Sequence, residues 1–159
     1  MVTNTETTSL EAAEFVRQFV EVWAQPTVER LDRLTHSDVE YIQPLHRTLQ
    51  GREAASDFWR QLFAMMPDLR AEVLNWAERD GVVYIEFQMS GTVAGNPIAW
   101  TAVDRYWLEE GTVRQRIAYF DPLPLAGKVA RRPRSALAFL RFGVRQTIAS
   151  VRNARPKSV

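Results

Sequence analysis

Four segments between residues 70 and 120 constrain the fold of this chain more than any other feature. Each is rich in β-branched and aromatic residues, and Arg-Asp-Gly, Ala-Gly-Asn-Pro and Glu-Glu-Gly separate them. Short glycine-containing sequences of this kind join antiparallel strands in hairpins. The sequence therefore predicts an antiparallel meander of four strands at Arg70–Glu78, Val82–Val93, Ile98–Leu108 and Val113–Phe120.

Helical patterns precede these segments. Apolar residues recur at helical spacing, and Thr8 and Glu11 have capping-box spacing where the first helical stretch begins. The sequence predicts helices at residues 8–25, 27–34 and 53–66, a turn at 36–38 and a short strand at 39–44. Helices followed by an antiparallel meander favour an α+β fold, in which the helices cover one face of the sheet.

Composition limits the chemistry that the chain can carry out. The 159 residues suffice for one domain with an appendage, and the absence of cysteine excludes disulfides and thiolate metal sites. The two histidines, His36 and His46, form no HxxxH or HExxH motif, so neither a metal nor another cofactor is expected. No secretory signal pattern and no membrane-spanning apolar run is evident, so we expect a cytoplasmic protein.

Three motifs occur in an order that resembles a known superfamily. They are VEYIQP at 39–44, LQGREA at 49–54 and GNPIAWTAVDRYWLEEGTVRQRIAYFDP at 95–122. Over residues 10–125 the chain resembles the nuclear transport factor 2-like superfamily, in particular its ketosteroid-isomerase-like and SnoaL-like (polyketide cyclase) members. The resemblance implies a cone-shaped α+β domain with a curved antiparallel sheet wrapped on three helices, a deep apolar pocket and a homodimer.

One acidic residue, Asp104, lies among apolar residues in the middle of the third predicted strand. Burial of a carboxylate is costly unless it is paired, so Asp104 needs a partner or a function. Strand alternation brings Arg116 of the next strand to the same face, with Tyr41 and Gln43 opposite. These groups can converge to orient a carbonyl or enolate, or Asp104 and Arg116 can form a structural ion pair. His46 follows a loop and could reach the pocket mouth as a general base.

The resemblance gives a mixed result when it is taken residue by residue. Asp104 matches the protonated acid that ketosteroid isomerases use in an oxyanion hole. Gln43 stands in place of their general base, and Phe19 in place of their oxyanion tyrosine, so their mechanism does not carry over unchanged. Relatives of limonene epoxide hydrolase use an Asp-Arg-Asp arrangement, whose positions correspond here to Met89, Gly91 and Ala118.

Two functions remain open at this stage. The first is a cofactor-independent acid/base enzyme, of isomerase, cyclase or lyase type, acting on a hydrophobic carbonyl-bearing small molecule in an apolar pocket. The second is a non-catalytic module of the same fold that binds a hydrophobic ligand. The candidate catalytic residues are Asp104, Arg116, Gln43, Tyr41 and His46. The predicted pocket wall consists of Phe19, Trp23, Trp59, Phe63, Phe87, Met89, Trp100, Ala118 and Phe120.

Charge is divided unevenly along the chain. Residues 1–125 contain all 19 acids and 11 of the 20 Lys and Arg residues, whereas residues 126–159 contain nine bases and no acid. The two parts therefore carry formal charges of −8 and +9. Prolines and glycine break up the stretch from 122 to 133. We therefore expect the cone domain at residues 1–127 and a basic tail at 128–159.

The tail is expected to contain an amphipathic helix from Ser135 to about Val151. Its main apolar stripe consists of Leu137, Leu140, Val144, Ile148 and Val151. The helix could fold back on the acidic body, pack its stripe on the pocket mouth or a dimer partner, or lie on an anionic membrane surface. We expect packing on the protein, because Phe139 and Phe142 lie off the stripe and also need cover. Nucleic acid binding is not expected, since no recognition motif accompanies the bases.

Overall fold

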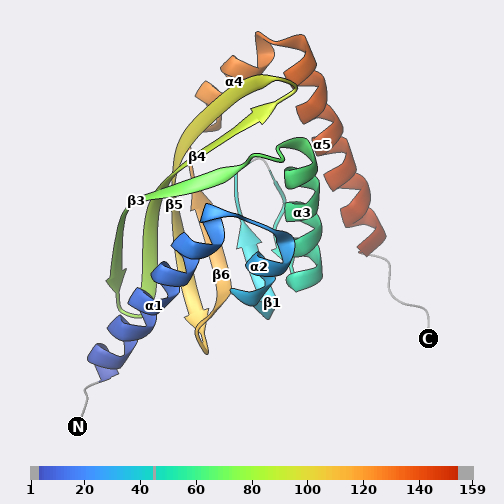
Figure 1. Cartoon of the computed structure of the whole chain (residues 1–159). Coiled ribbons are helices and arrows are strands. Elements are labelled where there is room, and N and C mark those ends of the chain that lie inside the picture. Colours follow the sequence, from blue (N-terminus) through green and yellow to red (C-terminus); the bar gives the residue numbers. More distant parts are fainter. Residues whose placement is uncertain (1–3, 45, 154–159) are drawn as a thin grey trace, which may run out of the picture.

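One six-strand sheet wraps around three helices in the computed structural model, which describes residues 4–44 and 46–153 (Figure 1). The helices are α1 (Asn4–Ala24), α2 (Val28–Arg33), α3 (Arg52–Met65), α4 (Pro122–Ala130) and α5 (Pro133–Asn153). The strands are β1 (Thr35–Ile42), β2 (Leu49–Gln50), β3 (Arg70–Arg79), β4 (Val82–Val93), β5 (Asn96–Glu109) and β6 (Thr112–Tyr119). Helices α1, α2 and α3 contact strands of this sheet, which confirms the predicted α+β fold.

Strands β3 to β6 form the predicted antiparallel meander, within a sheet of order β2-β1-β6-β5-β4-β3. Each hairpin turns through two residues of positive φ, of which the second is glycine: Asp80-Gly81, Ala94-Gly95 and Glu110-Gly111. Two-residue turns of this kind match the natural twist of paired strands. The turns therefore fix the register that brings specific side chains of β4, β5 and β6 together.

Strand β1 differs from the prediction in two ways. It begins earlier than expected, at Thr35, and it runs parallel to β6, so the sheet is mixed rather than wholly antiparallel. Thr35 pairs with Val113 of β6, and a register shift before Glu40 marks a bulge. Within the bulge His36 Nδ1 accepts a hydrogen bond from the Asp38 N–H (3.1 Å). The predicted turn at 36–38 is therefore wrong, because a bulge absorbs these residues without ending the strand.

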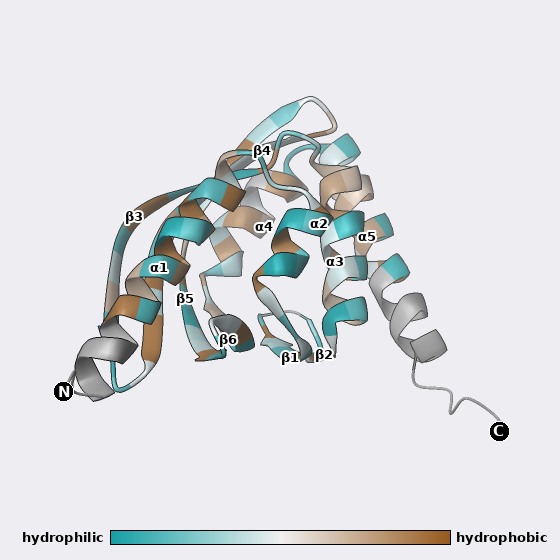
Figure 2. Ribbon diagram, turned by 60° about the horizontal axis from the view of Figure 1, so that its bottom comes forward, coloured by the Kyte–Doolittle hydropathy of each residue, from teal (hydrophilic) through white to brown (hydrophobic). Residues whose placement is uncertain are grey.

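Helix α1 packs aromatic side chains against the inside of the bent sheet. Hydrophobic and hydrophilic residues alternate along its ribbon (Figure 2). Phe15, Phe19 and Trp23 recur at helical spacing and are at most 3% exposed. The ring of Phe19 lies 5.8 Å from that of Tyr106 on β5 and 5.9 Å from that of Phe87 on β4. This aromatic layer covers the inner face of β4 and β5.

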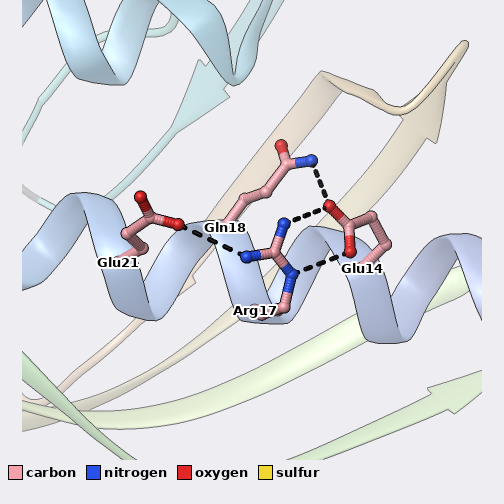
Figure 3. Close-up of polar contacts among 4 residues, drawn as sticks. All are labelled: Glu14, Arg17, Gln18 and Glu21. Atoms are coloured by element: carbon pink, nitrogen blue, oxygen red, sulfur yellow. Dashed lines mark hydrogen bonds and ion pairs between the residues drawn. The ribbon is translucent and has the colours of Figure 1, made fainter.

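The solvent face of α1 carries a network of charged side chains (Figure 3). The Arg17 guanidinium donates to both carboxylate oxygens of Glu14, at 2.6 and 2.9 Å, and pairs with Glu21 at 3.4 Å. Gln18 also donates to Glu14, at 2.7 Å. These hydrogen bonds, that of Arg17 foremost, lower the pKa of Glu14 to about 2.

We expect carbon NMR to show the Glu14 carboxyl titrating at a pKa of about 2. This pKa lies below that of an ordinary glutamate. The network therefore stabilises α1 at pH values above the ordinary glutamate pKa, and this stabilisation is lost as the pH falls toward 2. Arg17→Ala should return the Glu14 pKa most of the way to its usual value, and Gln18→Ala less so. An unchanged Glu14 pKa in Arg17→Ala would contradict this assignment.

The segment after β6 is a helix rather than the broken stretch that its prolines predict. The Asp121 carboxylate accepts a hydrogen bond from the Leu123 N–H (2.9 Å) and caps α4, while Pro122 occupies the first helical position. Proline is tolerated there because the first N–H groups of a helix have no partner within it. The expected domain end at residue 127 therefore falls inside a helix.

Helix α5 packs on α3, as expected for the tail, but through a different face. Phe139 and Phe142 pack against the core, and the Phe142 ring lies 5.9 Å from that of Phe58. Buried aromatic rings contribute more contact area than leucine or valine, which favours this face. The predicted stripe points outward instead, with exposed fractions of 46, 65 and 52% for Leu137, Leu140 and Val144. Ile148 and Val151 lie outside the side chains that the structure describes.

Ser135 attaches the start of α5 to the sheet. Its side chain is fully buried, and its hydroxyl donates to the Val93 carbonyl (3.0 Å) and accepts from Asn96 Nδ2 (3.1 Å). Ser135→Ala should lower the free energy of unfolding by about 1–3 kcal/mol, because both partners lose a buried hydrogen bond. Exposed Ser37→Ala is the control and should change it by less than about 0.5 kcal/mol. Denaturant unfolding of both variants checks this, and equal stabilities would contradict the proposed attachment.

Candidate functional site

Two cavities lie inside the cone, one behind the other. The inner cavity has a volume of about 30 Å³ and the outer one about 560 Å³. Trp59, Phe87, Met89 and Arg116 line both, so they form the partition between the two spaces. The outer cavity has the size and the mainly apolar wall of a small-molecule site.

Asp104 faces the inner cavity and is 0% exposed. Its Oδ2 accepts hydrogen bonds from the Tyr106 hydroxyl (2.9 Å) and from Arg116 Nε. Its Oδ1 has no partner among the described residues, and neither have the indole N–H groups of Trp23 and Trp59, whose side chains also line this cavity. A cavity of this size can accommodate a water molecule. Asp104 is not among the lining residues of the outer cavity, so it stands behind Arg116 rather than beside a ligand.

Arg116 is the charged group that the pair presents to the outer cavity. Its guanidinium carbon lies 5.3 Å from the centre of the Tyr41 ring and 5.4 Å from that of Trp59. Its Nη1 donates to Gln43 Oε1 at 3.4 Å. Burial disfavours the charged guanidinium, but the Asp104 carboxylate outweighs this and raises the pKa of Arg116 above its usual value. Arg116 therefore stays cationic, with its orientation fixed from three sides.

Tyr106 belongs to the site, although it was not among the candidate residues predicted from the sequence. Burial, followed by the charge of Asp104, raises the pKa of Tyr106 well above its ordinary value, so its hydroxyl remains a donor. The signal was available: residues two apart on a strand share a face, so Tyr106 must lie beside Asp104.

His46 and Gln43 line the outer cavity. The His46 ring meets Phe58 edge-on at 5.5 Å, and its Nδ1 lies 2.8 Å from the Arg47 carbonyl oxygen. Because a carbonyl only accepts, this contact requires a proton on Nδ1 and makes Nε2 the basic nitrogen of the neutral ring.

The predicted pocket wall divides between the two cavities. Phe19 and Trp23 line only the inner cavity, while Trp100 and Phe120 line only the outer one. Phe63 and Ala118 line neither of them: Phe63 stacks on Trp59 at 6.0 Å, and Ala118 pairs with Asp104 across β5 and β6.

Part of the outer wall comes from α4 and α5, which the predicted pocket wall did not include. These residues include Leu125 and Val129 of α4 and Phe139, Leu140 and Phe142 of α5. Phe139 and Phe142 gave the one available signal, since aromatic residues off the main stripe need a second surface to pack on.

Other kinds of site find no support in the part of the chain that the structure describes. Within it, three or more His, Cys, Asp or Glu side chains nowhere gather as a metal would require. None of the described helices has the length and apolar character needed to cross a membrane.

The fold and the two-chamber interior define an α+β cone of the nuclear transport factor 2-like type. A family model for the SnoaL-like domain matches residues 16–116. The chain therefore belongs to the SnoaL-like domain family. This family supports a small-molecule-binding, cyclase-type or isomerase-type role. No curated protein matches the sequence.

Solved structures agree on the fold. A ketosteroid-isomerase-like protein from Catenulispora acidiphila, in complex with trimethylamine, is 20% identical, with a TM-score of 0.62 over 68% of this chain and 85% of that one. A putative SnoaL-like polyketide cyclase from a Jannaschia species is 18% identical, with a TM-score of 0.64 over 73% and 89%. An epoxide hydrolase resembling limonene epoxide hydrolase, from M. tuberculosis, is 12% identical, with a TM-score of 0.62 over 91% and 98%. At these identities the likeness shows the fold alone.

The buried ion pair makes a prediction about stability. Asp104→Asn or Arg116→Met alone should lower the free energy of unfolding by about 3–5 kcal/mol, because each leaves its partner's charge buried and unpaired. The double variant Asp104→Asn/Arg116→Met should lose less than the sum of the two, since no buried charge remains. Denaturant unfolding of the four proteins measures the coupling, and additive losses would contradict a direct pair.

Proposed function

We propose that the chain is a cofactor-independent enzyme that stabilises an enolate of a hydrophobic carbonyl compound bound in the outer cavity. The observation that carries the proposal is Arg116, a cation held in place by Asp104 and by two aromatic rings at the partition of an apolar chamber of about 560 Å³. A fixed cation in a site of low dielectric stabilises developing negative charge far better than one in water.

In the proposed reaction, His46 Nε2 removes a proton from the carbon next to the substrate carbonyl. The electron pair of that C–H bond moves onto the oxygen, and Arg116 N–H groups stabilise the resulting enolate. Histidine then returns the proton to another carbon, which gives an isomerase. Alternatively the enolate carbon attacks a second carbonyl, whose π electron pair moves onto its oxygen, and that oxygen takes the proton back from histidine, which gives a cyclase. Gln43 orients the carbonyl beside Arg116.

Asp104 and Tyr41 act through Arg116 in this proposal. Asp104 compensates the guanidinium charge and, with the Tyr106 hydroxyl, fixes the orientation of Arg116. The Tyr41 ring lies under the cation, and its hydroxyl is 3.2 Å from Thr35 Oγ1. We therefore assign Asp104 a positioning role, instead of the donor or base role expected from the sequence.

The second candidate is a non-catalytic module that holds the same class of ligand. It is favoured by the outer cavity, where no Asp or Glu is among the described lining residues. Both candidates predict ligand binding, and only the first predicts turnover.

Binding and turnover can be measured separately. The probe for binding is 2-naphthol, a planar apolar compound whose oxygen mimics an enolate, and quenching of tryptophan fluorescence reports it because Trp59 and Trp100 line the chamber. The probes for turnover are β,γ-unsaturated ketones, whose isomerisation into conjugation raises ultraviolet absorbance. We expect the chain to bind the former and convert the latter.

Variants then assign the roles. His46→Gln should reduce turnover about 100-fold or more and leave naphthol binding nearly unchanged, while His36→Gln, which changes the histidine outside both cavities, should alter neither. The double variant Asp104→Asn/Arg116→Gln should weaken naphthol binding about tenfold or more, because the naphthol oxygen loses a hydrogen bond to a charged donor. Binding without any turnover would favour the module. Absence of binding would contradict both functions.

The homodimer is also a proposal. On the outer face of the sheet, Tyr84, Val103, Trp107 and Tyr119 are 39, 37, 51 and 53% exposed, which is a large apolar surface for a free sheet face. Light scattering should show a dimer for the chain and a monomer for Trp107→Arg/Tyr119→Arg. A monomeric parent chain would contradict this assignment.

Location in the cytoplasm stays a prediction.

A further inference from the structure

The outer face of α5 presents an apolar surface that none of the described residues covers. Leu137, Leu140 and Val144 are 46, 65 and 52% exposed, and their spacing places them in one stripe along the helix. The opposite face, with Phe139 and Phe142, is the one that packs on the core. Helix α5 lies at the outside of the molecule, on the side away from α1 (Figure 1).

A row of arginines follows one edge of this stripe. Arg134, Arg141 and Arg145 are exposed, and their helical positions put them side by side next to Leu137 and Val144. No ion pair joins them to an acid among the described side chains, although residues 1–125 carry a formal charge of −8. The positive charge of the helix is therefore available to an external partner.

We propose that this face of α5 docks on the surface of an anionic lipid bilayer. An amphipathic helix that lies parallel to the bilayer places its apolar residues at the boundary between headgroups and acyl chains. Arginine side chains beside the apolar stripe reach back to the headgroups and bind phosphate oxygens with two N–H groups. The stripe of α5 and its arginine row meet both requirements on one surface.

A second copy of the chain fits this face less well. Two α5 helices that meet through their stripes would bring two arginine rows together, and like charges in contact oppose association. The segment from 126 to 159, with nine bases and no acid, offers no compensating charge. Charge complementarity thus favours an anionic surface, and self-association becomes an outcome of the test.

The position of the outer cavity gives docking a consequence. Leu140 belongs to the exposed stripe and also lines the outer cavity. Gly143, about one helical turn further along α5, lines the cavity as well. A docked α5 would therefore hold the cavity mouth next to the bilayer, where ligands dissolved in lipid can enter. Docking itself does not rest on the proposed function, because it concerns only the exterior of α5.

Vesicle co-sedimentation of the full chain tests the proposal. The chain should sediment with phosphatidylcholine vesicles that contain phosphatidylglycerol, and much less with phosphatidylcholine alone. Added salt should weaken the binding, because it screens the exposed arginines. Arg141→Gln/Arg145→Gln should lower the partition coefficient about 30-fold, from about 1 kcal/mol for each arginine. Leu140→Glu/Val144→Glu should abolish binding.

Matched controls change the same residue types elsewhere. Arg70→Gln/Arg79→Gln removes the same charge from β3, and Leu10→Glu alters an equally exposed leucine (69%) on α1. Both controls should bind like the parent chain. Equal loss in the β3 variant would show that net charge alone acts and would overturn the α5 site. Absence of parent binding would overturn it too, as would light scattering in which Leu140→Glu/Val144→Glu dissociates an oligomer.

Discussion

The Asp104–Arg116 ion pair is the interaction on which the interior of this protein depends. It joins the middle of β5 to β6 inside the cone, and the side chain of Asp104 is 0% exposed. Two charges withdrawn from water are tolerated only when neighbouring groups help to compensate them. The Tyr106 hydroxyl and the rings of Tyr41 and Trp59 contribute to this, while Asp104 Oδ1 has no partner among the described residues.

That arrangement divides the interior by polarity. The acid and its unpartnered oxygen belong to the small inner cavity, and the cation faces the large apolar one. A ligand in the outer chamber therefore meets a positive group whose countercharge lies on the far side. This polarity suits an electron-rich oxygen, and it is the reason why the proposed reaction uses an enolate rather than proton abstraction by the carboxylate.

Most of the fold could be predicted from the sequence, because local patterns of residues specify its strands and turns. Three glycine turns defined β3 to β6, since a pair of positive-φ residues leaves little choice of register. Two errors came from local signals that tertiary contacts override. The residues of 36–38 are turn formers, yet pairing with β6 keeps them in β1. Prolines in the segment from 122 to 133 predict a break, yet the first of them occupies the one helical position where proline is favourable.

Strand alternation was enough to bring Asp104, Arg116, Tyr41 and Gln43 together, but not to say which group faces the ligand. Which group faces the outer cavity depends on the direction of each side chain and on the aromatic side chains of α1, and neither follows from residue spacing. The face of α5 was missed for a similar reason. Helical periodicity finds the longest apolar stripe, whereas packing selected the two phenylalanines.

The family match ends at residue 116, but much of the outer chamber's wall lies beyond it, from Phe120 to Gly143. The part of the chain that the family model matches and the part that completes the chamber wall thus follow one another in the sequence. Changes in the last two helices would alter the wall of the chamber, whereas Arg116 and the rings that hold it belong to the matched residues. Such a division gives this architecture an evolutionary freedom that a pocket built wholly from sheet residues lacks.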